Sequence, residues 1–166
     1  MDLKKHKKFL TSLTITLIIF LSDRISKIYV LNLFEDKIIN ELYINPYLNF
    51  FLIWNKGIAF GLFSIDKSLF YDLITVIIFG IIILILIMLK NSQGFKFYSL
   101  LLILGGSLGN LFDRLYYNAV PDFIDFHYHE IHWFIFNVAD IFITFGVICL
   151  IFTEIFLDTK KKNEIE

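Results

Sequence analysis

The sequence predicts an all-α membrane protein with four transmembrane helices in a single domain. Hydrophobic residues make up 57% of the 166 positions, and the mean hydropathy is +0.71. A helix needs about 20 largely apolar residues to cross the hydrocarbon core of a bilayer. Four stretches reach about that length, at residues 9–31, 69–89, 97–115 and 136–157. No long hydrophilic segment remains for a second domain, so we assign residues 1–166 to one membrane domain.

The first two stretches differ in character. Lysines precede residues 9–31, as in a secretory signal, but Ser22, Asp23 and Arg24 stand where a small-residue cleavage site would be expected. With three further spans downstream, we interpret this stretch as a retained helix. Residues 74–89 contain no charge at all. The absence of charge predicts a helix that forms a lipid-facing wall and does not contribute to a site.

The third and fourth stretches combine apolar residues with polar ones. Gly105, Gly106 and Gly109 lie in the third, where small residues permit close approach of another helix or of a substrate backbone. Packing alone is the alternative explanation for these glycines. The fourth stretch begins with polar residues, Asn137 and Asp140, and then continues as an apolar helix.

Lysines predict the orientation. They precede the first stretch, flank the turn between the second and third, and follow the fourth; the residues are Lys4, Lys5, Lys7, Lys8, Lys90, Lys96, Lys160, Lys161 and Lys162. Basic residues in short flanking loops are retained on the cytoplasmic side. Both termini are therefore expected inside, and the loops at residues 32–68 and 116–135 outside.

Charged residues within the spans predict a polar site near the outer surface. Each charge costs roughly 2.5–3.5 kcal/mol at the centre of a bilayer helix, so such residues usually serve a function. At 1.5 Å per residue, Asp23 and Asn110 each lie about 20 Å from the inner end of their spans. Asp140 lies at the outer entrance of the fourth span. Helical spacing places Lys27 on the face of Asp23, and Arg114 on the face of Asn110.

The outer loops predict a small β structure and a catalytic group. Residues 38–54 are rich in Ile, Tyr, Phe and Leu and are interrupted by Asn45-Pro46, which indicates two short strands or a hairpin, followed by a glycine-containing turn after Asn55. In the second loop, apolar and acidic residues alternate, which places Asp122 beside the level of Asp140. Two carboxylates at a water-excluding surface share a proton, as peptide hydrolysis by aspartates requires. An ion pair with Arg114 is the structural alternative.

Two other functions remain open at this point. His127, His129 and His132, with Glu130, would suit a metal site, but the spacing matches no zinc-protease motif, and we expect solvated histidines, no metal and no cofactor. Buried charge pairs also occur in small proton- or ion-coupled transporters. A through-route would need polar residues at several depths, whereas here the inner half of each span is apolar. No basic face suggests nucleic acid as a partner.

Five blocks of residues resemble the signatures of lipoprotein signal peptidase, the signal peptidase II family, in the family's order. They are Asp23-x-x-x-Lys27; Asn55-x-Gly57-x-Ala59-Phe60; Gly105-Gly106-x-x-Gly109-Asn110-x-x-Asp113-Arg114; Val120-x-Asp122-Phe123-Ile124; and Phe136-Asn137-x-Ala139-Asp140. The resemblance implies an aspartic endopeptidase of the bacterial inner membrane, sensitive to globomycin, that removes the signal peptide of diacylglyceryl-modified prolipoproteins before the lipidated cysteine.

The resemblance also implies roles for individual residues. Asp122 and Asp140 match the catalytic dyad. The supporting and substrate-binding positions are Asn55, Gly57, Gly106, Asn110, Asp113, Arg114 and Asn137, with Asp23 and Lys27 as a structural pair. The family fold adds an extracytoplasmic β-sheet cradle and a short surface helix. Arg24 departs from the family, which usually has Gln there; we expect it to extend outward or to pair with Glu35 or Asp36.

Overall fold

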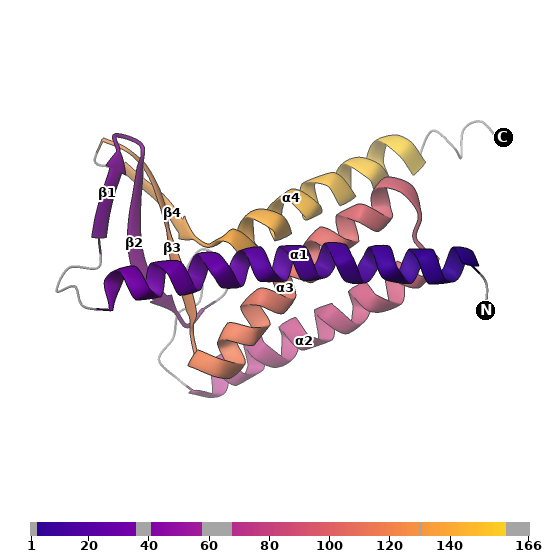
Figure 1. Cartoon of the computed structure of the whole chain (residues 1–166), viewed down its shortest axis with the longest axis horizontal. Coiled ribbons are helices and arrows are strands. Elements are labelled where there is room, and N and C mark those ends of the chain that lie inside the picture. Colours follow the sequence, from indigo (N-terminus) through magenta and orange to yellow (C-terminus); the bar gives the residue numbers. More distant parts are fainter. Residues whose placement is uncertain (1–2, 36–40, 58–67, 130, 159–166) are drawn as a thin grey trace.

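The described part of the chain forms four α-helices and one sheet (Figure 1). The computed structural model describes residues 3–35, 41–57, 68–129 and 131–158. The helices are α1 (Leu3–Phe34), α2 (Ser68–Asn91), α3 (Gly94–Tyr117) and α4 (Val138–Phe152), the last continued by a π-helical segment, η2 (Thr153–Asp158). Four helices of the described residues are long and apolar enough to cross a membrane, which confirms the predicted spans.

Helix α3 lies at the centre of the bundle, because α1, α2 and α4 all pack against it. Its buried leucines, Leu100, Leu101 and Leu104, form a core with Ile82 and Ile85 of α2. Within a membrane, residues of this core stabilise the contact between helices through van der Waals packing, because lipid is as apolar as the core itself. Most other side chains of α2 face outward, as expected for a lipid-facing wall.

The glycines of α3 serve helix packing. A Cβ on Gly106 would lie 2.5 Å from the carbonyl oxygen of Ala139 in α4, and one on Gly105 would lie 2.7 Å from Ile19 in α1. Only a residue without a side chain permits these approaches. Of the two explanations that the sequence left open, close contact with neighbouring helices is the one realised here.

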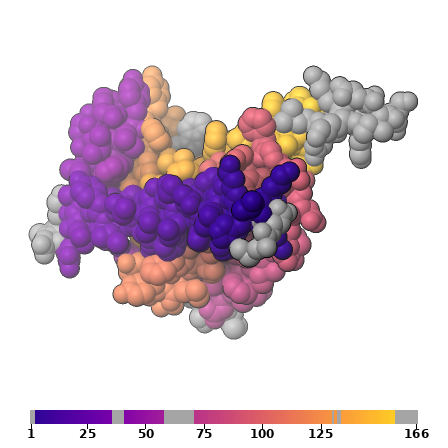
Figure 2. Space-filling model, turned by 45° about the vertical axis from the view of Figure 1, so that its right-hand side comes forward, coloured from indigo at the N-terminus to yellow at the C-terminus, as the bar shows by residue number. Residues whose placement is uncertain are grey.

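The sheet stands at the opposite end of the bundle from the start of α1 and the end of α4 (Figure 1). Its four antiparallel strands follow the order β1-β2-β3-β4; they are β1 (Glu41–Asn45), β2 (Leu48–Asn55), β3 (Val120–Tyr128) and β4 (Ile131–Phe136). Figure 2 shows β1 and β2 standing out beyond the bundle, beside the outer part of α1. Val30 and Phe34 of α1 join Leu52 and Phe123 of the sheet in a second core.

The predicted hairpin is confirmed, and the second outer loop contains more structure than expected. The turn between β1 and β2 is closed by Asn45, whose Oδ1 accepts a hydrogen bond of 2.9 Å from the Tyr47 amide. Residues 120–128 and 131–135, expected within a loop, belong to β3 and β4, and β3 pairs with β2 so that Val120 lies opposite Asn55. This pairing brings the two outer segments together.

The fourth span begins later than predicted. Phe136 ends β4, and α4 starts at Val138. Asn137 caps the helix: its Oδ1 accepts from the Asp140 amide at 3.1 Å, and Asp140 Oδ2 accepts from the Asn137 amide at 3.3 Å. The boundary was missed because residues 134–136 are apolar, and hydropathy does not distinguish a short strand from a helix start. A short surface helix is not among the elements of the described ranges.

Candidate active site

Asp122 and Asp140 are brought together by a residue that contacts both of them. Asn137 Nδ2 donates to Asp122 Oδ1 at 2.5 Å, and its backbone amide donates to Asp140 Oδ2 at 3.3 Å. Asp122 comes from β3 and Asp140 from the first turn of α4. Their exposed fractions are 0% and 3%. The two aspartates predicted from sequence to act together therefore share one buried environment.

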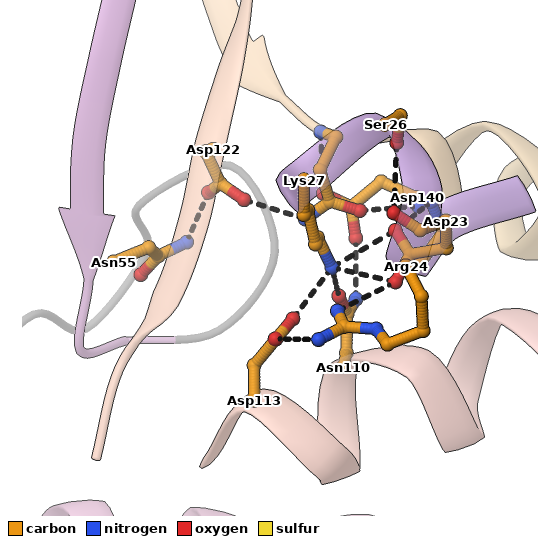
Figure 3. A network of polar contacts seen from close by, with 11 residues as sticks. Asp23, Arg24, Ser26, Lys27, Asn55, Asn110, Asp113, Asp122 and Asp140 are labelled. Carbon is orange, nitrogen blue, oxygen red and sulfur yellow. Dashed lines mark hydrogen bonds and ion pairs between the residues drawn. The ribbon is translucent and has the colours of Figure 1, made fainter. Parts of the chain in front are cut away.

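Asn55 holds Asp122 from the other side (Figure 3). Its Nδ2 donates to Asp122 Oδ2 at 2.8 Å, and its Oδ1 accepts from the Gly57 amide, also at 2.8 Å. Both oxygens of Asp122 thus receive a hydrogen bond, which fixes the rotation of the carboxyl group. Gly57 contributes through its backbone. Ala59 and Phe60 of the same sequence block lie outside the described residues.

Asn110 links α3 to the Asp140 carboxylate. Its Nδ2 donates to Asp140 Oδ1 at 2.8 Å, and its Oδ1 accepts from Lys27 Nζ at 3.0 Å. Gly106 lies one turn earlier on α3 and lets α4 approach closely enough for this bond. Asn110 is therefore the connection between the aspartate pair and the charges on α1.

A cluster of four charged residues lies next to Asn110 (Figure 3). Lys27 Nζ is 2.9 Å from the Asp23 carboxylate and 2.6 Å from Asp113 Oδ2. Arg24 Nη2 is 2.8 Å from Asp23, and its Nη1 is 2.5 Å from Asp113. Two acids and two bases make the cluster electrically neutral, so its burial is tolerated. Asp23 Oδ1 also accepts from the Ala139 amide at 3.0 Å, which anchors the start of α4.

The expectation for Arg24 was wrong. It does not extend into solvent, since it is 8% exposed, and it pairs inward with Asp23 and Asp113; Asp36 lies outside the described residues. Its guanidinium lies 4.8 Å from the Phe112 ring and 5.9 Å from the Phe20 ring. A planar guanidinium stacks on aromatic faces and pairs with two carboxylates at once, so the inward position is the more stable one.

Arg114 faces the aspartate site without forming an ion pair with any carboxylate of the described residues. It is 3% exposed, its Nη2 donates to the Gly57 carbonyl, and its guanidinium lies 5.2 Å from the Tyr71 ring. Its Nε and Nη1 are buried with no hydrogen-bond partner in the described part of the chain. The alternative of an Arg114–Asp140 salt bridge is therefore not realised, and Arg114 keeps donor capacity.

Tyr71 is a neighbour of the site that no pattern in the sequence singled out. Its hydroxyl donates to the Arg114 carbonyl at 2.9 Å, and its ring lies beside the guanidinium. It belongs to α2, the helix predicted to be a lipid-facing wall. The only signal was a tyrosine at the outer end of that helix, where aromatic residues are common in any membrane protein.

A cavity of about 300 Å³ contains the polar groups and extends between the helices. Its polar lining is Asn55, Ser107, Asn110, Arg114, Asp122 and Asp140, and its apolar lining is Ile78, Ile81, Ile103, Val120, Ile143 and Val147. A second hollow of about 460 Å³ adjoins Asp140 on another face of α4, lined by Phe134, Phe136, Ile141, Thr144, Phe145 and Ile148. Asp140 thus lies at the head of two largely apolar spaces.

Burial changes the acidity of Asp122. Loss of hydration, together with the nearby Asp140 charge, raises the pKa of this carboxyl to about 7. Hydrogen bonds from Asn55 and Asn137 act in the opposite sense and are the smaller effect. A carboxyl with this pKa is able to hold and release a proton near neutral pH.

Asp125, three residues after Asp122 on β3, is 3% exposed, and the pairing of β3 with β2 places it opposite Asn49. Among the described residues, no three His, Cys, Asp or Glu side chains could hold one metal ion. His127 Nδ1 lies 3.8 Å from Asp125, and Glu130 is outside the described ranges.

Together, the fold and the site define a helical membrane protein with a buried aspartate pair at one end. Comparison with known proteins adds the family. The model of signal peptidase (SPase) II matches residues 15–156. The chain is 54% identical to lipoprotein signal peptidase of Pelagibacter ubique (strain HTCC1062) over 158 residues, covering 95% of each chain. The corresponding protein of Thermodesulfovibrio yellowstonii is 39% identical over 153 residues, covering 92% of this chain and 97% of that protein.

Solved structures agree with this result. One bacterial membrane enzyme, determined by the in meso method, has a TM-score of 0.70 and 32% identity, covering 92% of this chain and 91% of its own. A second has a TM-score of 0.68 and 29% identity, covering 89% and 94%. The chain belongs to the signal peptidase II family. It is a protease of the bacterial inner membrane, and the transporter interpretation is set aside.

Proposed function

We propose that this protein is an aspartic endopeptidase that removes the signal peptide from diacylglyceryl-modified prolipoproteins, cutting before the lipidated cysteine. The observation that carries the proposal is the pair Asp122 and Asp140, bridged by Asn137 at the head of an apolar cavity. The relatives named lipoprotein signal peptidase support the substrate class. No cofactor or metal is required by this chemistry.

The proposed mechanism divides acid and base roles between the two aspartates. Asp122, with a pKa of about 7, carries the shared proton and donates a hydrogen bond to the scissile carbonyl oxygen. Asp140 lies in the first turn of α4, where the helix dipole stabilises negative charge. Its carboxylate accepts a proton from the water that attacks the carbonyl carbon. That proton then passes to the leaving amine as the C–N bond breaks.

Neighbouring side chains orient the reacting groups. Asn55 and Asn137 hold the Asp122 carboxyl, and Asn110 holds that of Asp140. Arg114 Nε and Nη1, which have no hydrogen-bond partner among the described residues, belong to a side chain at the wall of the same cavity and are placed to bind a substrate carbonyl. Asp23, Lys27 and Asp113 keep α1, α3 and α4 in register behind the site and do not line the cavity.

The two apolar spaces beside Asp140 suit the proposed substrate. A lipidated precursor has an apolar signal segment on one side of the scissile bond and two acyl chains on the other. The cavity facing α2 and α3 includes the polar groups that would hold peptide, while the hollow lined by Phe136, Phe145 and Ile148 is almost wholly apolar. Substrate would enter laterally from lipid. The end of the bundle that carries the flanking lysines is expected to be cytoplasmic, so the site, at the opposite end, faces the extracytoplasmic side.

The test is cleavage of a diacylglyceryl-modified prolipoprotein by the purified protein in detergent. Asp122→Asn and Asp140→Asn should each abolish cleavage while the protein remains folded, and Asp72→Asn, at an exposed position of α2, is the matched control. Globomycin should inhibit, whereas EDTA should not. Full activity of either dyad variant, or loss of activity with EDTA, would overturn the aspartic mechanism. Cleavage of the unlipidated precursor at the same rate would overturn the proposed substrate class.

A further inference from the structure

A groove at the other end of the bundle is separate from the aspartate site. Helices α1 and α2 both pack against α3 but hardly contact each other. Their facing surfaces leave a groove of about 620 Å³ with Leu104 of α3 at its base. Ligand sites commonly have volumes of roughly 300–1,000 Å³, so this space is large enough for one.

The groove has an apolar wall and a positively charged end. Phe9 and Leu13 of α1 and Leu86 and Leu89 of α2 line it, and Phe9 is 63% exposed. Lys5, Lys8 and Lys90 also line it, and none of its lining residues is acidic. These lysines come from the first turns of α1 and the last turn of α2, so they meet at the membrane surface.

Lys8 fixes the shape of the charged end. Its Nζ donates to the Lys90 carbonyl at 3.1 Å and to the Ser92 carbonyl at 2.8 Å, and it lies 5.1 Å from the Phe97 ring. These contacts tie α1 to the end of α2. Lys5 and Lys90 are exposed, and their ammonium groups take part in no ion pair within the described ranges.

We propose that this groove binds an anionic phospholipid, with its phosphate between Lys5 and Lys90 and an acyl chain along Phe9, Leu13 and Leu86. Basic pockets between transmembrane helices bind anionic lipid head groups, since charge and apolar surface are both satisfied there. A second copy of this chain would bring its own lysines against these and be repelled. The proposal does not depend on the proteolytic function, because the groove lies at the opposite end from the aspartates.

The experiment measures lipid binding to the full-length protein in a neutral detergent. Native mass spectrometry and thermal unfolding are followed while phosphatidylglycerol, phosphatidylcholine or inorganic phosphate is added. Phosphatidylglycerol should remain bound and raise the unfolding temperature, whereas the other two should do neither. Lys5→Gln with Lys90→Gln should weaken phosphatidylglycerol binding about 30-fold, roughly five-fold for each lysine.

The matched control removes the same number of charges from the same end. Lys4→Gln with Lys7→Gln changes two lysines that do not line the groove and should leave binding nearly unchanged. Leu13→Trp, which fills the apolar wall, should also reduce binding while the lysines remain. Equal binding of phosphatidylcholine, an equal effect of phosphate alone, or equal loss in the two double variants would each overturn the proposal.

Discussion

The contact between α3 and α4 at Gly106 gives a sharp test of how the site is positioned. In Gly106→Ala, the new Cβ would lie 2.5 Å from the Ala139 carbonyl oxygen, whereas ordinary contact begins at 3.4 Å. The obstacle is backbone rather than a flexible side chain, so the helices must separate by about 0.9 Å. Overpacking of this kind costs roughly 1–3 kcal/mol of stability.

Separation of α3 and α4 would also displace residues of the proposed catalytic site. Asn110 lies one turn from Gly106, and its 2.8 Å bond to Asp140 would lengthen beyond the limit of a hydrogen bond. Because misplacement by about 1 Å can cost 10²-fold in rate, we expect kcat/KM for the lipidated precursor to fall by about that factor.

Gly80→Ala is the control for this experiment. A Cβ at Gly80 of α2 would meet nothing within 4 Å, so cleavage and unfolding temperature should stay at or above the wild-type values. The assay measures cleavage rate and thermal unfolding for each variant in the same detergent. A folded Gly106→Ala protein that cleaves at the wild-type rate would refute the claim that close α3–α4 packing positions Asp140.

Four further predictions concern ionisable residues. The cleavage rate should fall on the alkaline side as Asp122 loses its proton, with a midpoint near pH 7, and a flat profile there would contradict its role as acid. Below the unfolded-state pKa of 3.8, the raised pKa of Asp122 stabilises the folded protein, and this contribution is lost as the pH rises through about 7. The unfolding temperature of the wild type should therefore decline over this pH range, and that of Asp122→Asn should lack this decline. Arg24→Gln should lower the free energy of unfolding by about 3 kcal/mol, the low end for a broken buried ion pair, because Lys27 still neutralises Asp113; an unchanged value would show that the pair contributes nothing. Asp125→Asn should leave cleavage nearly intact, because Asp125 does not line the cavity and its spacing of three residues from Asp122 places it on the other face of the strand. A loss of cleavage equal to that of Asp122→Asn would show that the loop aspartate was wrongly chosen.

Hydropathy and spacing predicted most of the helical part of this protein. Apolar length determines where a helix can cross a bilayer, and the cost of burying charge marks which polar residues have a reason to be there. Asp23 and Asn110 were placed at one depth on these grounds, and in the structure Lys27 donates a hydrogen bond to each of them. The first hairpin was also predicted from the sequence, because its β-forming composition and its turn residues are local properties.

The tertiary structure alone decided how distant segments meet. The pairing of β2 with β3, which places Asn55 against Asp122, depends on contacts across 67 positions of sequence. Arg24 turned inward because Asp113, on another helix, offered a second carboxylate, and no local pattern encodes that choice. Periodicity describes which face of an element is apolar, whereas partners are selected by the packing of elements that lie far apart in the chain.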